Sequence, residues 1–438
     1  MTFYSTNNSA HVVPLREALF NSLPVDNGLY MPTSIPKLPD GFLGGIINQS
    51  LVEIAYKLSE IWLRDELTNE QIEKLVTVAF PFDTPLVELE AGRKYVLELF
   101  HGPSLAFKDV GARFMAGLMS IFATTQSREI HILVATSGDT GGAVAMGFHN
   151  VPGIRVSILY PKGRVSVLQE KQLTTLGGNI QAYEVDGSFD DCQAIVKQAF
   201  LDPDLTKAFS LSSANSINIF RLIPQSFYYF RALAQLNTLK LPIVFSTPSG
   251  NFGNLSAGVL GWRMGMPVQS FIAATNLNKV VPSFLESGNF VPTTSLATLS
   301  NAMDVGNPSN LVRLQRLTDD NHQTLTNLVK GYYFTDDQTI SEMISLKNTY
   351  NYLVCPHTAI GLLGLNHYSN GRRIPFCGVA LATAHPAKFS PTVDSIFGFK
   401  INVPEHLNAL MSQLSVTTKI SARFSDFKEI FLHEKYAL

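Results

Sequence analysis

Short apolar runs that end in glycine-rich or hydroxyl-rich loops recur along this chain and set its fold class. Helical patterns follow two of them, at 141–148 and 255–264. The runs themselves lie at 130–135, 154–160, 241–246 and 376–382. Strands that alternate with helices are typical of an α/β protein whose sheets are mostly parallel. Ligands in such sheets bind at loops that leave the carboxyl ends of strands, here 136–141, 247–254 and 383–388.

The length of 438 residues exceeds what one compact lobe usually holds, so more than one domain is expected. Helical patterns begin near Ser50 and Thr68, and Pro81 and Pro85 then interrupt them and mark a seam. The predicted parts are a mainly helical N-terminal domain at 1–85, two α/β lobes within 86–438, and the smaller of these lobes at roughly 105–215.

Composition argues against several classes of function. The formal net charge of -2, from 33 basic and 35 acidic residues, gives no electrostatic case for nucleic acid or an anionic membrane. Cys192, Cys355 and Cys377 form no close pair, so neither a disulfide framework nor a metal site is favoured. The first residues lack the pattern of a secretory signal, and no apolar stretch is long enough to span a bilayer. We expect a cytoplasmic protein without a metal.

The loop at 249–254 reads Ser-Gly-Asn-Phe-Gly-Asn and joins a strand to a helix. Its glycines let backbone N–H groups converge, and the helix presents its positive end, so a phosphate could be held there without a lysine. The loop matches neither G-x-G-x-x-G nor G-x-x-x-x-G-K-[ST], which disfavours dinucleotide and nucleotide ligands. The alternative is an ordinary tight turn.

A second loop, at 136–142, reads Thr-Ser-Gly-Asp-Thr-Gly-Gly. Its hydroxyl and N–H groups would suit a carboxylate at the start of a helix. The alternative is that Ser137 or Thr140 merely caps that helix, and for the loop alone this alternative is preferred.

Lys108 follows an apolar Leu-Ala-Phe tripeptide. Burial disfavours the charged form of lysine, and a neutral amine can form a Schiff base or act as a base. The alternative is a solvated lysine paired with Asp109. Thr383 either bonds a ring nitrogen or simply ends a strand, while His385 and Lys388 either line the same pocket or are cap and surface residues.

Together, these segments resemble the threonine synthase family. Phe-His-Gly-Pro-Ser-Leu-Ala-Phe-Lys-Asp at 100–109 is similar to the family's cofactor-lysine motif, in which Lys108 matches the lysine that carries pyridoxal phosphate. The segment 382–389 is similar to the one in which a threonine, here Thr383, faces the pyridine nitrogen. The other similar segments are the carboxylate loop 135–141, the phosphate cup 248–254, the N-terminal opening 24–32, and 213–218 and 302–310. The resemblance thus covers nearly the whole chain, in the expected order.

The resemblance implies fold type II, the tryptophan-synthase-β-like fold, with the added N-terminal domain of the longer members. It also implies pyridoxal 5'-phosphate as cofactor and a reaction of O-phospho-L-homoserine with water to give L-threonine and phosphate. Lys108 would hold the cofactor as a Schiff base and then move protons at the α- and β-carbons. The implied cofactor-binding residues are Lys108, Gly250, Asn251, Phe252, Gly253, Asn254 and Thr383.

Substrate contacts are predicted from the same resemblance and from charge, because an anionic substrate needs cationic partners. The candidates are Ser104, Ser137, Asp139, Thr140, Lys162, Arg221, His385 and Lys388. Among them, Ser137, Asp139 and Thr140 are candidates for the substrate carboxylate or the cofactor 3′-oxygen. The chain departs from the family pattern at Arg164, where a lysine is more usual, and after Asn310, where an aromatic residue is replaced by Leu-Val.

Two alternative functions remain open at this point. One is another enzyme of the same cofactor fold, either a threonine or serine dehydratase-like enzyme or a cysteine-synthase-like β-replacement enzyme. The other is a relative that binds pyridoxal phosphate without the synthase reaction. The partner is predicted to be a small molecule, with neither nucleic acid nor membrane, and a monomer is favoured.

Overall fold

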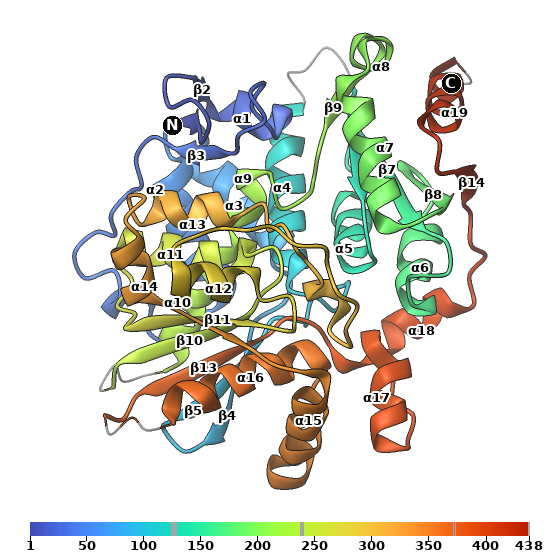
Figure 1. Ribbon diagram of the computed structural model, residues 1–438. Coiled ribbons are helices and arrows are strands. Elements are labelled where there is room, and N and C mark those ends of the chain that lie inside the picture. Colours follow the sequence, from blue (N-terminus) through green and yellow to red (C-terminus); the bar gives the residue numbers. More distant parts are fainter. Residues whose placement is uncertain (124–128, 237–240, 371, 373, 437–438) are drawn as a thin grey trace.

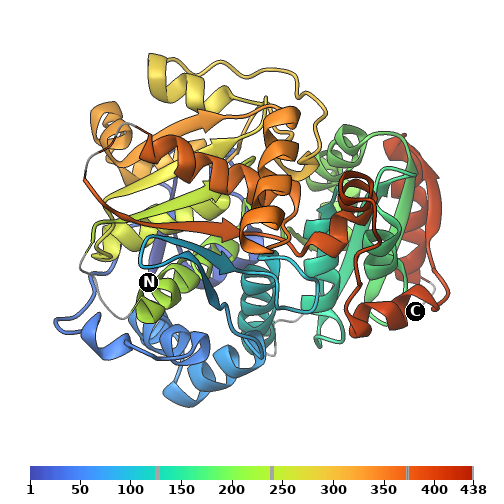
Figure 2. The ribbon, with the colours of Figure 1, turned by 90° about the horizontal axis from the view of Figure 1, so that it is seen from below.

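The computed structural model describes the whole chain except residues 124–128, 237–240, 371, 373 and 437–438. The chain forms a larger lobe, a smaller lobe beside it and an N-terminal part packed on the larger lobe (Figures 1 and 2). Among the described residues, no helix is long and apolar enough to cross a bilayer.

The N-terminal part combines a small antiparallel sheet, with strand order β2-β1-β3, and several helices. Its elements are β1 (Thr2–Ser5), β2 (Val12–Pro14), α1 (Leu15–Asn21), β3 (Tyr30–Pro32), η1 (Gly44–Ile46), α2 (Leu51–Leu63) and α3 (Asn69–Ala79). The two predicted helix starts are confirmed, because Ser50 forms a capping box with Glu53 and Thr68 forms one with Gln71. The three short strands were not expected from the sequence.

The larger lobe contains a six-stranded sheet with the order β12-β11-β10-β13-β5-β4, parallel except for β4. Its strands are β4 (Leu86–Glu90), β5 (Lys94–Glu98), β10 (Ile243–Pro248), β11 (Ser270–Thr275), β12 (Val329–Tyr333) and β13 (Cys377–Ala382). Its helices are α10 (Gln225–Gln235), α11 (Gly253–Met264), α12 (Val280–Ser287), η2 (Asn301–Met303), α13 (Leu311–Leu317), α14 (His322–Leu328), α15 (Asp336–Tyr350), α16 (Pro356–Ser369), η3 (Pro386–Phe389) and α17 (Ser390–Phe397).

The smaller lobe contains a five-stranded, fully parallel sheet with the order β14-β8-β7-β6-β9. Its strands are β6 (Ile130–Ala135), β7 (Ile154–Pro161), β8 (Ile180–Asp186), β9 (Ser210–Ser212) and β14 (Thr418–Ser421). Its helices are α5 (Asp139–Phe148), α6 (Val167–Thr174), α7 (Phe189–Leu201), α8 (Pro203–Ala208), α18 (Glu405–Met411) and α19 (Phe424–Tyr436). The C-terminal segment crosses from the larger lobe to add β14 and α19 (Figure 2), so this sheet extends beyond the predicted span 105–215.

Helices α4 (Lys108–Ala123) and α9 (Ile219–Leu222) join the parts of the molecule. Helix α4 packs against α3 of the N-terminal part, α9, and α5 of the smaller lobe. Adjacent residues on the central strands face opposite cores: Phe245 belongs to the core shared with the N-terminal part, and Val244 to the core under α15 and α16. The fully buried, apolar strands are those expected of a parallel sheet covered on both faces.

The predicted strands are present in the structure, and the predicted ligand loops follow them. The runs at 130–135, 154–160, 241–246 and 376–382 correspond to β6, β7, β10 and β13. Strands β10 and β13 are hydrogen-bonded neighbours, so the loops that follow them leave the same edge of the sheet side by side. The predicted mixed fold of two mostly parallel lobes is therefore confirmed.

Arg313 ties the N-terminal sheet to the larger lobe. Its fully buried guanidinium donates to the carbonyl oxygens of Ser216 (2.9 Å), Ile217 (2.6 Å) and Tyr30 (3.2 Å), and to Asn310 Oδ1 (2.8 Å). Burial lowers its pKa to about 9. The planar guanidinium reaches four acceptors through two nitrogens, whereas a lysine ammonium has only three N–H donors on one nitrogen.

Replacing Arg313 with Lys is therefore expected to destabilise the fold by roughly 2 kcal/mol, since two or more buried carbonyls lose a donor. The loss will be seen as an earlier midpoint in urea unfolding followed by circular dichroism. The matched control is Arg164→Lys, a change at an exposed position. Equal midpoints for the two variants would show that the Arg313 fork does not hold these parts together.

Candidate active site

Lys108 is the first residue of α4 and lies beside the segment after β13. Phe107 N donates to Thr383 O (2.9 Å), His385 N donates to Leu105 O (3.0 Å), and Ala106 pairs with Ala384. This antiparallel contact brings Lys108 next to Thr383, although 275 positions separate them in the numbering (383 minus 108). The predicted neighbourhood of these two residues is thus present in the fold.

Burial lowers the pKa of the half-buried Lys108 amine to about 8; Asp139 opposes the shift, while Lys388 and Arg221 add to it. The alternative pairing with Asp109 is not found in the described part of the chain. Asp109 Oδ2 instead accepts from Ser104 N (2.8 Å), and burial raises the pKa of Asp109 to about 6. An amine of lowered pKa is neutral in a useful fraction of molecules near neutral pH, as a carbonyl-binding lysine requires.

The glycine-rich loop at 249–254 turns sharply into α11. Phe252 adopts a left-handed conformation with φ of 61°, and α11 begins at the next residue. A Cβ on Gly250 would lie 2.7 Å from Met303 Cα and 3.1 Å from Ala302 O, so only glycine fits without movement of that backbone. The loop therefore packs closely against the 302–303 segment. Helix α11 begins within the loop, so the positive N-terminal end of the helix lies there.

Asn254 gives the clearest sign that this loop fits a phosphate-bearing cofactor. Its Oδ1 accepts from the hydroxyls of Tyr228 (2.6 Å) and Tyr229 (2.8 Å), which fixes the orientation of the amide. Its buried Nδ2 has no hydrogen-bond partner among the described residues. A buried donor held in place next to a helix N-terminus suits an anionic oxygen.

Asn251 has a different role in this structure. Its Nδ2 donates to Ser216 Oγ (2.7 Å), and its Oδ1 accepts from Ser309 N (2.7 Å) and Ser309 Oγ (2.9 Å). The side chain thus braces the loop against two neighbouring segments. The predicted contact between Asn251 and the cofactor remains a prediction.

Replacing Asn254 with Ala is expected to weaken cofactor binding about tenfold, because one hydrogen bond to a charged group contributes about 1.5 kcal/mol. The measurement is an equilibrium titration of the cofactor-free chain with pyridoxal phosphate. Asn289→Ala, at an exposed position, is the control. Equal affinities in the two variants would argue against a cofactor contact at Asn254.

Thr136 caps the start of α5. Its Oγ1 accepts from Gly138 N (2.9 Å) and Gly141 N (2.8 Å). The alternative in which Ser137 or Thr140 acts as the cap is therefore wrong: the side chain one turn before the helix is better placed to reach these N–H groups. Ser137 is exposed and Thr140 half-buried, so both remain free for the roles predicted for them.

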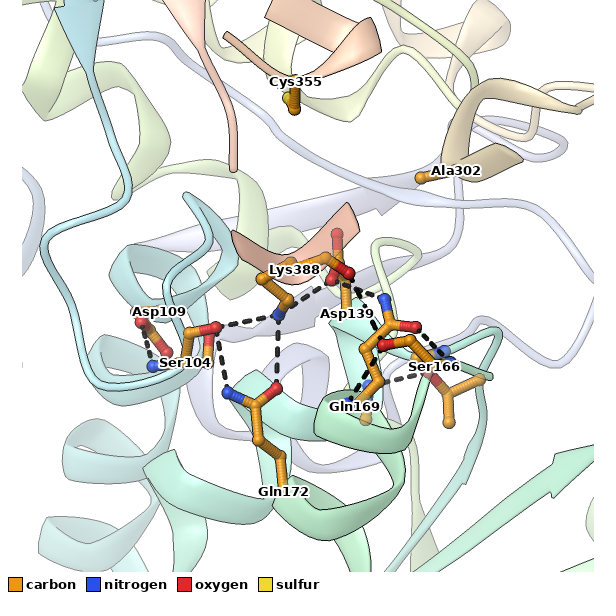
Figure 3. Close-up of polar contacts among 12 residues, drawn as sticks. Ser104, Asp109, Asp139, Ser166, Gln169, Gln172, Ala302, Cys355 and Lys388 are labelled. Atoms are coloured by element: carbon orange, nitrogen blue, oxygen red, sulfur yellow. Dashed lines mark hydrogen bonds and ion pairs between the residues drawn. The ribbon is translucent and has the colours of Figure 1, made fainter. Parts of the chain in front are cut away.

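Asp139 and Lys388 are paired with each other rather than directed to separate partners (Figure 3). Lys388 Nζ lies 2.8 Å from Asp139 Oδ1, and the two side chains are 0% and 7% exposed. Burial would raise the pKa of Asp139, but Lys388 and Lys108 hold that pKa well below its usual range. Both predicted substrate contacts therefore involve groups that already have a strong ionic partner.

The remaining candidates differ in their surroundings. Ser104 is buried, and its carbonyl oxygen accepts from Lys388 (2.8 Å) and Gln172 (3.2 Å). His385 is half-buried; burial lowers its pKa to about 4, and its Nδ1 accepts from Ala387 N (3.1 Å). The neutral ring thus caps η3, which is the structural role left open for it.

The other two predicted cations differ in exposure. Arg221 is buried, donates to Ala214 O, and lies 3.5 Å from Lys108 O; burial lowers its pKa to about 10. Lys162 is exposed and lies 3.9 Å from Asp186, at the carboxyl ends of β7 and β8. Their predicted contacts with the substrate phosphate remain predictions.

Sequence reasoning missed several residues that shape the site. His357 is buried and accepts from Ala302 N (3.3 Å), and burial lowers its pKa to about 4; Lys108 and Asp139 both act on it. Tyr228 and Tyr229 orient Asn254, and Gln169 donates to Asp139 Oδ1 (3.0 Å). None of these residues lies in a glycine-rich loop, and no local pattern distinguishes them from core residues.

Two mostly parallel α/β lobes, with Lys108 at the start of a helix that packs against the smaller lobe, agree with the class of pyridoxal-phosphate-dependent enzymes of fold type II. The family model described as "Pyridoxal-phosphate dependent enzyme" matches residues 79–375. Models described as "Threonine synthase N terminus" and "Threonine synthase, C-terminal" match residues 2–80 and 358–430.

The relatives are similar along nearly the whole chain. Threonine synthase of Haemophilus influenzae is 43% identical over 409 residues, which cover 93% of this chain and 94% of that protein. The crystal structure of threonine synthase from Escherichia coli has a TM-score of 0.92 at 40% identity and covers 99% of this chain and 100% of its own. The structure of pyridoxal-phosphate-bound threonine synthase from Brucella melitensis has a TM-score of 0.92 at 33% identity, with 99% of both chains covered.

The chain belongs to the threonine synthase family. Its activity is that family's pyridoxal-phosphate-dependent lyase activity on a small-molecule substrate, and its cofactor is pyridoxal 5'-phosphate. The resemblance seen in the sequence motifs is thus confirmed.

Proposed function

We propose that this chain converts O-phospho-L-homoserine and water to L-threonine and phosphate, by loss of phosphate from the γ-carbon and addition of water at the β-carbon. The observation that carries the proposal is the pairing of the segment before Lys108 with the segment after β13, next to β10 and the glycine-rich loop that follows it, in a chain similar throughout to threonine synthases. When bound, pyridoxal phosphate supplies the electron sink that stabilises negative charge on the substrate carbons.

Lys108 is proposed to carry the cofactor and to act as the base. With the cofactor bound, Lys108 Nζ would take the proton from the substrate α-carbon and later move protons at the β-carbon. A pKa of about 8, caused by burial, favours both roles, because a general base works best when its pKa lies near the operating pH.

The phosphate of the cofactor is proposed to lie at the N-terminus of α11. Gly250, Phe252 and Gly253 would contribute backbone N–H groups, and Asn254 its oriented Nδ2. Backbone donors at a helix start hold a phosphate without a lysine. The hydroxyl of Thr383 is proposed to face the ring nitrogen; a hydroxyl there leaves that nitrogen mostly neutral, which moderates the electron sink.

The substrate is proposed to bind between this site and the start of α5. The exposed Ser137 and the half-buried Thr140 are the candidates for its carboxylate, at a helix end that favours negative charge. Lys162 is the accessible cation among those predicted for the substrate phosphate. Asp139, Lys388 and His385 would act mainly by shaping the site, because their side chains are bonded within the protein, as Arg221 is through its terminal nitrogens. The buried Ser104 hydroxyl has no partner among the described residues and stays a candidate for a substrate contact.

The experiment is to incubate the purified holoenzyme with O-phospho-L-homoserine and to measure threonine and free phosphate. Equimolar formation of the two products is expected. Threonine and O-acetylserine are tested in parallel, because deamination of threonine would favour the dehydratase alternative. A protein with bound cofactor that turns over none of these compounds would be a non-synthase relative.

We further propose that the enzyme is a cytoplasmic monomer with a domain boundary near residue 85. Cys192, Cys355 and Cys377 are buried free thiols, which suits a reducing compartment. Light scattering of the purified protein tests the monomer, and limited proteolysis near residue 85 tests the boundary.

A further inference from the structure

The charged groups that act on Lys108 come from several elements, and they include both an anion and cations. Asp139 at the start of α5 is the anion that acts on Lys108, whereas Lys388 of η3 and Arg221 of α9 are cations. His357 of α16 also lies within electrostatic reach, and its lowered pKa leaves it neutral near pH 7. On α4 itself, Asp109 is bonded to Ser104 N. A buried carboxylate close to an amine favours the ammonium form of that amine.

Asp139 and Lys108 occupy equivalent places on two helices packed side by side. Each is the first residue of its helix, α5 and α4. The helices approach closely at Gly147, where a Cβ would lie 3.3 Å from backbone atoms of Ala112 and Arg113. Lys388 Nζ bridges Asp139 Oδ1 and Ser104 O, and Ser104 lies four residues before Lys108 (108 minus 104), so the Asp139 carboxylate lies near the start of α4. It needs a partner other than Lys108 if the Lys108 amine is to be neutral.

Lys388 is that partner. Its Nζ contacts Asp139 Oδ1 (2.8 Å), Ser104 O (2.8 Å) and Gln172 Oε1 (3.3 Å), which uses all three N–H groups of an ammonium (Figure 3). These acceptors come from α5, the loop before α4, and α6. With its side chain 0% exposed, Lys388 has no donor left for a substrate.

We propose that Lys388 is a positioning residue that occupies the Asp139 carboxylate and so keeps that carboxylate from pairing with Lys108. The Lys108 amine then stays available to the cofactor. The ion pair is nearly neutral as a unit, so the fold can place a carboxylate beside the amine without fixing a proton on that amine. The inference rests on the proposed role of Lys108.

The test is trace acetylation of Lys108 with acetic anhydride across pH, read by peptide mass spectrometry on the full chain after removal of the cofactor. In Lys388→Met, Asp139 loses its cation and Lys108 becomes the nearest replacement. Labelling at pH 7.5 is expected to fall at least about tenfold, since each pKa unit changes the neutral fraction about tenfold. Lys74→Met, at an exposed lysine, is the control and should match the wild type.

Two further variants separate this effect from a loss of packing. Asp139→Asn removes the anion, so labelling of Lys108 at pH 7.5 should rise. Lys388→Met/Asp139→Asn removes both charges and should restore labelling to within about threefold of the wild type. A merely structural role for Lys388 would move all three variants in the same direction.

The proposal is overturned if Lys388→Met labels like the wild type, or if the double variant stays as slow as Lys388→Met. If Lys388→Met does not fold, the rise in labelling expected for Asp139→Asn and the near-wild-type labelling expected for the double variant decide the matter. The acetylation reports on the amine whether or not it binds the cofactor. A failure of the proposed function would instead appear as a Lys108→Ala variant that retains lysine-bound cofactor absorbance and turnover.

Discussion

Replacing Lys108 with Ala abolishes attachment of the cofactor and lowers turnover of O-phospho-L-homoserine by at least roughly 10³-fold, since one residue provides both the covalent anchor and the base. The neighbouring groups cannot substitute for it: Lys388 is bonded to Asp139, and Arg221 to backbone carbonyls. The measurements are threonine and phosphate release, together with the visible absorbance of the bound cofactor.

The control for this variant is Lys74→Ala, which removes an exposed lysine and should change neither quantity. Methylamine added to Lys108→Ala should restore part of the turnover, because a small amine can enter the space of the missing side chain. Unimpaired product release by Lys108→Ala would show that the cofactor lysine lies elsewhere and would remove the basis of the proposed mechanism.

The sequence was most informative where backbone geometry and burial act locally. Apolar runs predicted β6, β10 and β13, and glycines marked the turn at 249–254, because these signals depend on residues close in the chain. The parallel-sheet rule then indicated which loops bind ligands, and the adjacency of β10 and β13 agrees with it. Pairing Lys108 with the cofactor depended on family resemblance, since an isolated lysine is more often solvated.

The sequence was least informative about which polar groups satisfy one another. Lys388 lies 249 positions after Asp139 in the numbering (388 minus 139), and no spacing predicts that the two form a buried ion pair. Asn251 and Asn254 share one motif, yet one braces neighbouring loops and the other is oriented by two tyrosines. Such partnerships depend on tertiary packing, in which a buried charge must find whatever partner the fold brings near.

The same dependence explains two features of the fold that were not expected. β14 joins the smaller lobe by pairing with β8 across more than two hundred residues of chain, a long-range contact without a local signal. In the N-terminal part, β1, β2 and β3 are three or four residues long, too short to show the alternation that marks a strand.

Replacing Gly250 with Ala is expected to weaken binding of pyridoxal phosphate roughly 100-fold, or about 2.7 kcal/mol, within the range for overpacking a close contact. The added Cβ would lie 2.7 Å from Met303 Cα, so the backbone of one segment must move. The 302–303 segment is firmly held, because Ala302 N donates to His357 Nε2 and Asp304 accepts from Asn276. The backbone of the glycine loop must therefore shift, and its N–H groups, which would face the phosphate, shift with it.

The affinity is measured by titrating the cofactor-free variant with pyridoxal phosphate, with circular dichroism to show that the fold is kept. Gly44→Ala is the matched control, because a Cβ there meets no atom within 4 Å. The loss should appear in the affinity for pyridoxal phosphate and equally for inorganic phosphate as a competitor, since the contact at stake is with the phosphate group. Wild-type affinity in Gly250→Ala would mean that the cofactor phosphate does not lie in this loop.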